Sequence, residues 1–248
     1  MSLLIFILGV VIGSFLNVCI YRIPRGESVA YPPSHCYNCN KNLKWYDLFP
    51  IVSYIFLKGK CRYCKVKISI QYPVIELFTG IIYLLIYIHY GVTLNMFKYI
   101  ILASFFIVIG IIDLKTTDIY DITILTPAVI GIIFLIYEYY IGISISGNII
   151  GIVLMLFIIG GLILITKGMA VGDLEMYLLV PLYMGLKNSI LVLLLSIIIG
   201  GSFGIVLILT KKKTKKDYIP FGQYITIATL IVMLYGENII NWYFNLII

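Results

Sequence analysis

Two aspartates at the edges of apolar runs are the residues of this sequence best suited to chemistry. Asp113 follows Ile112, and Asp173 follows Gly172. An ionised carboxylate at membrane depth is energetically expensive, so an acid there is a functional candidate. Two carboxylates that lie close together share a proton, because both cannot ionise cheaply. The ionised one then activates water, while the protonated one polarises a peptide carbonyl and donates to the leaving amine, which predicts peptide hydrolysis.

Each aspartate also has a plainer structural interpretation. Asp113 fits a helix-end carboxylate that faces water near Lys115, and Asp173 fits the N-cap of the next helix. Asp118 and Asp121 lie in the same short loop as Asp113, so it is not the only acid there. The two residues alone therefore leave the catalytic and the structural interpretations open.

Four cysteines form two C-x2-C pairs in the one long polar stretch of the chain. Two such pairs bring four thiolates into tetrahedral reach, which predicts a zinc ribbon with a structural, closed metal site. The alternative is two disulfides, which a reducing cytoplasm disfavours. A structural metal would hold together a loop too small and too polar to fold on its own core. The predicted Zn²⁺ ligands are Cys36, Cys39, Cys61 and Cys64.

The composition places these residues in a membrane protein. Of the 248 residues, 62% are hydrophobic and 12% are charged, whereas soluble domains carry roughly 25% charged residues. A membrane-spanning helix needs about 20 apolar residues. The sequence predicts an all-α polytopic protein with about eight transmembrane helices and a small zinc-ribbon-like loop. The apolar runs lie at 2–21, 74–90, 97–112, 122–141, 148–166, 174–187, 188–210 and 219–247.

The same pattern predicts three parts of the chain and their orientation. Residues 1–21 form a first transmembrane helix, 22–72 a cytoplasmic four-cysteine loop, and 73–248 a helical membrane domain. Sixteen of the 18 Lys and Arg lie in alternate loops, including the run 211–216. The positive-inside rule then places those loops in the cytoplasm and the N-terminus outside. Both aspartates lie at cytoplasmic helix ends, and the basic loops contact anionic lipid rather than nucleic acid.

Two smaller features concern helix packing and depth. The run after Asp173 is short, so either it re-enters the membrane or Asp173 lies below the membrane surface in a cavity that admits water. Glycine pairs at four-residue spacing are typical of close helix contacts in lipid. These pairs are Gly9 and Gly13, Gly147 and Gly151, and Gly200 and Gly204.

Taken together, the motifs resemble those of the type IV prepilin leader peptidase family, membrane aspartyl proteases of the GxGD type. The resemblance extends over nearly the whole chain, and its motifs are specific only in combination. They are Gly13-Ser14-Phe15-Leu16-Asn17-Val18, Tyr21-Arg22-Ile23-Pro24, the two cysteine pairs, Ile68-Ser69, Tyr72-Pro73-Val74-Ile75-Glu76-Leu77, Ile112-Asp113 with Asp121, Gly172-Asp173, and Pro220-Phe221-Gly222.

The resemblance implies that residues 73–248 form a peptidase domain in which Asp113 and Asp173 are the catalytic pair. It implies removal of a basic leader from prepilins or pseudopilins at the cytoplasmic face of the cell membrane. It also implies N-methylation of the new N-terminus with S-adenosylmethionine, for which residues 22–72 and Glu76 are candidate participants. The chain departs from the family at Ala170, where Gly is usual, and at Glu175, where Lys is usual. We expect these changes to alter pH dependence or substrate preference.

Two other function classes remain open from the sequence. A proton- or cation-coupled transporter would use Asp113 and Asp173 as ion sites. Against this, the sequence shows no repeated halves, and both acids lie towards one face. The other alternative is a zinc-loop scaffold without enzymatic activity.

Overall fold

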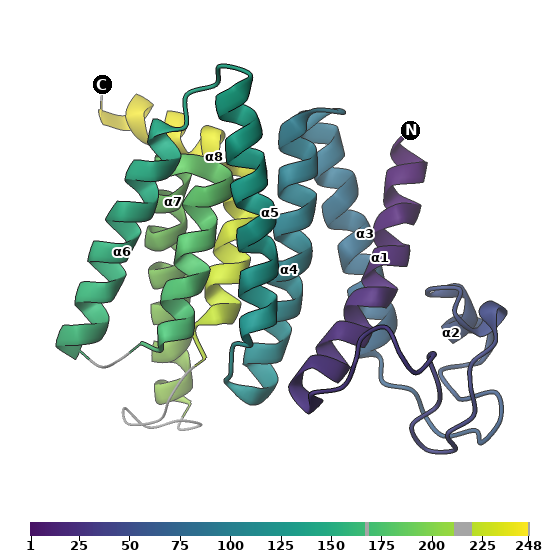
Figure 1. Ribbon diagram of the computed structural model, residues 1–248. Helices are drawn as coiled ribbons and strands as arrows, with labels where there is room; N and C mark the ends of the chain where they lie inside the picture. The colour runs from purple at the N-terminus through teal and green to yellow at the C-terminus, as the bar shows by residue number, and fades with distance from the viewer. Residues whose placement is uncertain (167–168, 211–219, 248) are drawn as a thin grey trace. The chain divides into compact units, whose positions relative to one another are not determined.

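The computed structural model describes residues 1–166, 169–210 and 220–247, and the regular elements in this part of the chain are helices (Figure 1). The described part contains isolated β-bridges but no strand. The basic run 211–216 lies outside it. The elements are α1 (Ser2–Arg22), η1 (Ile23–Arg25), η2 (Trp45–Asp47), α2 (Val52–Phe56), α3 (Gln71–Tyr90), α4 (Leu94–Thr116), α5 (Asp121–Tyr140), α6 (Ser146–Thr166), α7 (Val171–Leu209) and α8 (Gly222–Ile247).

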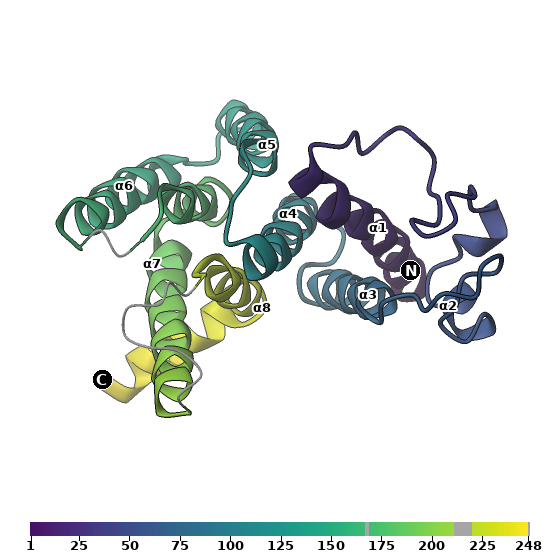
Figure 2. The ribbon, with the colours of Figure 1, turned by 90° about the horizontal axis from the view of Figure 1, so that it is seen from below.

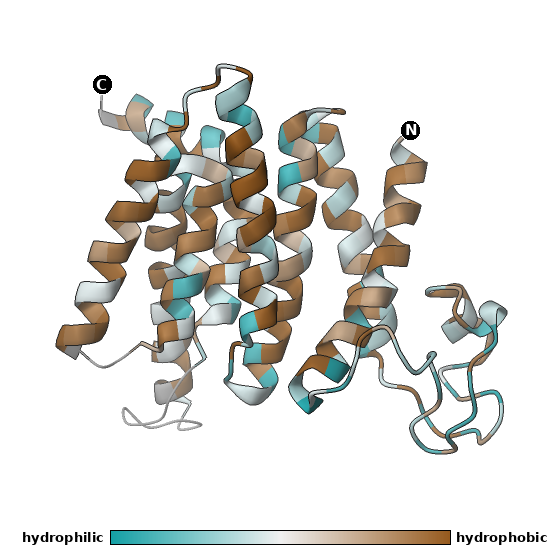
Figure 3. Ribbon diagram, viewed as in Figure 1, coloured by the Kyte–Doolittle hydropathy of each residue, from teal (hydrophilic) through white to brown (hydrophobic). Residues whose placement is uncertain are grey.

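Seven of these helices are long and apolar enough to cross a membrane, which makes the chain a multi-pass membrane protein. Figure 3 shows the apolar residues along the long helices and the polar ones in the loop between α1 and α3. A helix that is apolar on all sides is suited to lipid or to a membrane bundle rather than to a soluble surface. The predicted fold class is confirmed.

The helix α7 accounts for two of the predicted apolar runs. Its backbone leaves the helical conformation at Gly185, where φ is 75° and ψ is −178°. Only glycine adopts such a conformation without strain. The Tyr177 hydroxyl lies 2.6 Å from the Ser196 hydroxyl, so the segments before and after Gly185 run side by side. Figure 2 shows them as separate coils. The predicted runs 174–187 and 188–210 are these two halves.

The chain divides into two compact units, Met1–Met96 and Phe97–Ile248. In the first unit, α1 packs closely on α3 through glycines. A Cβ on Gly9 would lie 2.8 Å from the Cα of Gly80, and one on Gly13 would lie 2.8 Å from the Cα of Glu76. This pair of glycines is therefore a helix contact, as its spacing predicted. The predicted domain boundaries after residues 21 and 72 stay a prediction.

In the second unit, α7 packs against α5, α6 and α8, and α8 also contacts α4. The Thr226 hydroxyl of α8 donates to the Phe106 carbonyl of α4 at 3.0 Å. A Cβ on Gly110 would lie 2.6 Å from the Thr226 Oγ1. The small residue on α4 thus lets α8 approach the helix that carries Asp113.

Candidate active site and metal centre

The structure brings both predicted aspartates into the interior of the second unit. Asp113 lies in the last turn of α4 and Asp173 in the first turn of α7, and their exposed fractions are 2% and 1%. The interpretation of Asp113 as a carboxylate facing water is therefore wrong. Buried carboxylates are costly, so the groups around each one decide what it can do.

Asp113 lies against the N-terminus of α8. The backbone N–H groups of Gly222 and Gln223 point to its carboxylate. A helix N-terminus carries partial positive charge and unsatisfied N–H groups, so it stabilises a carboxylate placed there. Within the part of the chain that the structure describes, Asp113 Oδ2 has no hydrogen-bond partner. A carboxylate beside a helix N-terminus that keeps one oxygen without a partner is suited to accept a proton from water or to share one.

Asp173 is held by the turn before it. Its Oδ2 accepts the backbone N–H of Ala170 at 3.0 Å, and its own N–H donates to the Ala170 carbonyl at 3.1 Å. This is one half of a capping box, in which Asp173 is the third residue of α7 and accepts from the residue before the helix. The interpretation of Asp173 as the N-cap of the helix is therefore wrong. The residue that departs from the family pattern, Ala170, therefore contacts Asp173 directly through its backbone.

Several contacts place the two aspartates in one site. The charge of Asp113 acts on Asp173. Gly222, beside Asp113, also reaches α7, because a Cβ on it would lie 3.1 Å from the Met176 Sδ, one turn after Asp173. On the other side, a Cβ on Gly172 would lie 2.8 Å from the Ile119 Cβ in the loop that follows Asp113. Glycines at 172 and 222 thus allow α4, α7 and α8 to meet around both acids.

Neighbouring residues complete the site. Tyr177 is fully buried and lies within electrostatic reach of Asp173. Its hydroxyl forms the hydrogen bond to Ser196 that joins the two halves of α7. Glu175 instead interacts with Asp121, at the start of α5. The departure at Glu175 thus places an acid beside Asp121. Sequence reasoning missed Tyr177 and Ser196, and it noted Gly222 without a role, because their positions depend on helix contacts distant in the chain.

The four cysteines of the first unit form a compact cluster. Their sulfur atoms all lie within 4.8 Å of one another. The Cys36 and Cys64 sulfurs are 3.7 Å apart, close to the ~3.8 Å edge of a tetrahedron with Zn–S bonds of about 2.3 Å. All four are thiols rather than disulfides. The cluster therefore has the ligand number and spacing of a structural metal site.

The two cysteine pairs have the same backbone geometry. The Cys36 N–H donates to the Lys41 carbonyl and the Cys61 N–H to the Val66 carbonyl, at 3.0 and 2.9 Å. In each knuckle the fourth residue after the first cysteine has positive φ, namely Asn40 at 53° and Lys65 at 62°. The knuckles are thus two copies of one turn, which explains why the C-x2-C spacing occurs twice.

Hydrogen bonds to sulfur favour the thiolate that a metal requires. The Val66 backbone N–H is the main cause that lowers the pKa of the Cys64 thiol from 9.0 to about 6. The second knuckle is also joined to η2, because the Arg62 Nε donates to Asp47 Oδ1 at 2.6 Å. Because residues around a metal site orient its ligands, this ion pair helps to hold the second knuckle in position.

The family motifs of the first unit meet between α1, α3 and the loop. The Asn17 side chain donates to the Tyr72 carbonyl at 3.1 Å. Glu76 is buried, and its Oε2 accepts the Ile51 N–H at 2.7 Å. Arg22, also buried, donates to the Ser28 and Pro32 carbonyls. These motif residues therefore position the loop through hydrogen bonds to its backbone, and Glu76 binds the loop at Ile51.

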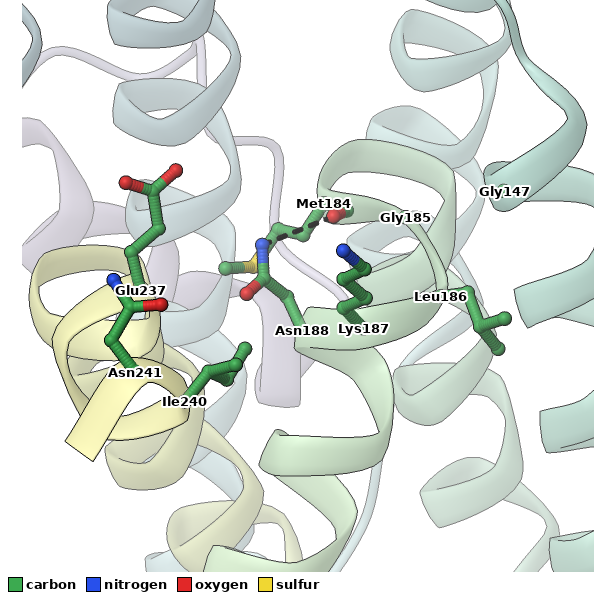
Figure 4. Close-up of a pocket in the computed structure, with 9 residues that line it drawn as sticks. All are labelled: Gly147, Met184, Gly185, Leu186, Lys187, Asn188, Glu237, Ile240 and Asn241. Carbon is green, nitrogen blue, oxygen red and sulfur yellow. Dashed lines mark hydrogen bonds between the residues drawn. The ribbon is translucent and has the colours of Figure 1, made fainter. Parts of the chain in front are cut away.

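A separate pocket lies at the other end of the second unit (Figure 4). It has a volume of about 620 Å³ and is lined by Gly147, Met184, Gly185, Leu186, Lys187, Asn188, Glu237, Ile240 and Asn241. Glu237 follows Gly222 by 15 residues on α8, which is about 22 Å at ~1.5 Å per residue. The pocket therefore lies far from the aspartates.

Comparisons with known proteins agree with the site. Residues 7–90 match the family model of the bacterial peptidase A24 N-terminal domain, and residues 100–205 match that of the type IV leader peptidase family. A prepilin leader peptidase/N-methyltransferase of Bacillus subtilis is 28% identical over 98% of both chains. One of Aeromonas salmonicida is 29% identical over 99% of this chain and 94% of its own. No solved structure matches at a significant level.

The two matched regions together include the N-terminal signature, both cysteine pairs and both aspartates. The resemblance that the motifs indicated is thereby confirmed, and the chain belongs to the type IV leader peptidase family.

Proposed function

We propose that this chain removes the basic leader peptide from type IV prepilins or pseudopilins with Asp113 and Asp173 as the catalytic pair. The observation that carries this proposal is the burial of both acids at the ends of α4 and α7, around the N-terminus of α8. The names of the relatives, prepilin leader peptidase/N-methyltransferase, support a peptidase rather than a transporter.

The chemistry follows from two carboxylates that share one proton. The ionised carboxylate accepts a proton from a water molecule, whose oxygen attacks the scissile carbonyl carbon. The protonated carboxylate donates a hydrogen bond to the carbonyl oxygen, and a proton then passes to the leaving amine as the C–N bond breaks. The pair titrates as a unit, so neither role belongs to one residue alone. Burial strengthens these interactions because it lowers the local dielectric constant.

The second activity in this proposal is methylation of the new N-terminal amine. S-adenosylmethionine would supply the methyl group, and the amine is its acceptor. The support is the matched N-terminal domain together with the names of the full-length relatives. The Cys36, Cys39, Cys61 and Cys64 thiolates would hold a zinc ion as a closed, structural site. Metal analysis of purified protein tests this, with Cys61→Ser expected to lose the metal and the unrelated Cys19→Ser to keep it.

We further propose that the chain lies in the cell membrane with its N-terminus outside and Asp113 and Asp173 towards the cytoplasm. The charge distribution supports this orientation, since 16 of the 18 Lys and Arg lie in, or at the ends of, alternate connections between the predicted spans. A prepilin has a basic leader before an apolar helix, so its scissile bond lies at the membrane surface. Acids at the ends of membrane helices are suited to meet it there.

Leader removal in cells tests the proposed function. A prepilin co-expressed with the protein is expected to be processed by the wild type and to stay unprocessed with Asp113→Asn or Asp173→Asn. Asp118→Asn is the matched control, because Asp118 is an exposed acid five residues after Asp113. Mass spectrometry of the mature pilin reports the methyl group in the same samples. Processing by both aspartate variants would exclude the aspartyl mechanism.

A further inference from the structure

One short segment of the first unit presents its apolar side chains outward. Residues 45–57, here called the η2–α2 segment, include Trp45, Phe49, Val52, Ile55 and Phe56, all of them exposed. Trp45 is 73% exposed and Phe56 is 81% exposed. The Trp45 and Phe49 rings lie 5.8 Å apart, so the two aromatics belong to one surface. Contiguous apolar surface of this kind marks an interaction site.

The helix α2 has its apolar face on the outside. Val52, Ile55 and Phe56 follow the i, i+3, i+4 spacing that places side chains on one helix face. Tyr54, on a different face, donates to the Ile68 carbonyl at 3.3 Å, which directs that face towards the second cysteine knuckle. The polar part of α2 is thus turned inward and its apolar part outward, the reverse of a helix on a soluble domain.

A hydrogen bond fixes the level of this segment along a membrane helix. The Ile51 N–H, at the start of α2, donates to Glu76 Oε2 of α3 at 2.7 Å. Glu76 is the sixth residue of α3, about 7.5 Å from its first residue at ~1.5 Å per residue. Since α3 has the length and composition of a membrane span, Ile51 lies beside the span rather than beyond its end. Figure 1 shows α2 alongside α1 and α3 at a height between their ends.

The charges around the segment fit one kind of surface. Residues 22–72 contain nine Lys and Arg but only two acids, Glu27 and Asp47. Asp47 is already paired with Arg62. Lys44 precedes the segment and Lys58 follows it, and both are exposed. Long basic side chains at the edges of an apolar face can reach phosphate groups while the apolar face enters the acyl region.

We propose that the η2–α2 segment is an interfacial membrane anchor, with Trp45, Phe49, Val52, Ile55 and Phe56 in the headgroup–acyl boundary of an anionic leaflet. The bilayer is favoured over a protein partner because the Glu76 bond places the segment at membrane depth and its flanking charges match anionic headgroups. The anchor would hold the cysteine knuckles at the membrane surface beside α3. This inference stands independently of the peptidase activity.

The chain contains two tryptophans, Trp45 and Trp242, so Trp242→Phe leaves Trp45 as the only reporter. The full-length, metal-loaded variant is reconstituted in vesicles that contain phosphatidylglycerol. Its fluorescence is measured with aqueous iodide and with lipids that carry nitroxide in the headgroup, near the start of the acyl chain, or near its end. We expect the strongest quenching by the headgroup and shallow acyl labels, and little quenching by iodide. Quenching by iodide without quenching by labelled lipid would overturn the proposal.

Two comparisons separate lipid from a protein occupant. Ile55→Asp with Phe56→Asp, in the Trp242→Phe background, is expected to increase iodide quenching of Trp45 at unchanged metal content. Tyr31→Asp is the control, because Tyr31 is an exposed aromatic of the same loop outside the segment. Addition of a prepilin is expected to leave the lipid quenching unchanged. If Trp45 is open to iodide until a prepilin is added, the surface receives the substrate and the proposal is wrong. Should the double variant lose its metal, the Trp242→Phe measurement alone decides.

Discussion

Gly222 lies directly against the Asp113 carboxylate, at the point where α8 begins. A Cβ on Gly222 would lie 2.9 Å from Asp113 Oδ2 and 3.1 Å from the Met176 Sδ. The space for a carboxylate at the end of α4 thus exists because residue 222, more than 100 positions later in the chain, has no side chain. The glycine of the Pro220-Phe221-Gly222 motif acquires a role in building the site.

Replacing Gly222 by alanine should therefore impair cleavage more than folding. The added methyl group must displace the Asp113 carboxylate or the Met176 side chain, and a displacement of about 1 Å at a catalytic group can cost on the order of 10²-fold in rate. The kcat for a prepilin peptide, measured with purified protein, checks this. Gly201→Ala is the matched control, since a Cβ there meets nothing within 4 Å. Equal rates for the two variants would contradict the proposed position of Gly222.

In the buried ion pair of the second unit, loss of one charge should destabilise the protein more than loss of both charges. Lys98 Nζ lies 2.6 Å from Glu138 Oε1, and both side chains are less than one tenth exposed. Lys98→Met leaves Glu138 buried without its cation, which should cost about 3–5 kcal/mol of stability. Combining Lys98→Met with Glu138→Gln removes both charges and should restore most of that loss. Unfolding in detergent measures the stability of the single and the double variant. A double variant less stable than Lys98→Met would contradict this account.

The Cys64 thiol should react at unusually low pH when the metal has been removed. Its pKa in the folded chain is lowered to about 6 from 9.0, chiefly because the Val66 N–H donates to it. The reactive thiolate is therefore present above about pH 6 and is lost as the pH falls through that value. Alkylation rates of Cys64, followed by peptide mass spectrometry in reduced and chelated protein, give the profile. In denaturant the midpoint should move towards 9.0, and an unchanged midpoint would contradict the role of the Val66 N–H.

The sequence predicted the parts of this molecule that repeat or that have strict spacing. The apolar runs predicted the helices, and the cysteine spacing predicted the cluster, because both patterns report local geometry. It also identified Asp113 and Asp173 as candidates, since acids beside apolar runs are rare. It did not predict that Gly222 would lie against Asp113, that Lys98 would pair with Glu138, or that Glu175 would interact with Asp121. Those relations depend on how each helix is rotated and which neighbour it meets.

The two halves of α7 also show that the sequence located the segments but not the contacts between them. Two apolar runs were predicted at 174–187 and 188–210, and the structure joins them through Gly185. The pattern of apolar residues located both segments, but the hydrogen bond between Tyr177 and Ser196 that pairs them was not readable from it. Polar residues inside apolar runs were the available signal, because buried hydroxyl groups require partners.

The central claim is that Asp113 and Asp173 act as one catalytic unit, and a double-mutant cycle tests it most directly. Cleavage of a prepilin peptide is measured with purified, reconstituted wild type, Asp113→Asn, Asp173→Asn and the double variant. Because members of one catalytic unit are not additive, each single variant should lose nearly all activity and the double variant should lose no more. Near wild-type cleavage by either single variant, in protein that keeps its fold and metal content, would contradict the account.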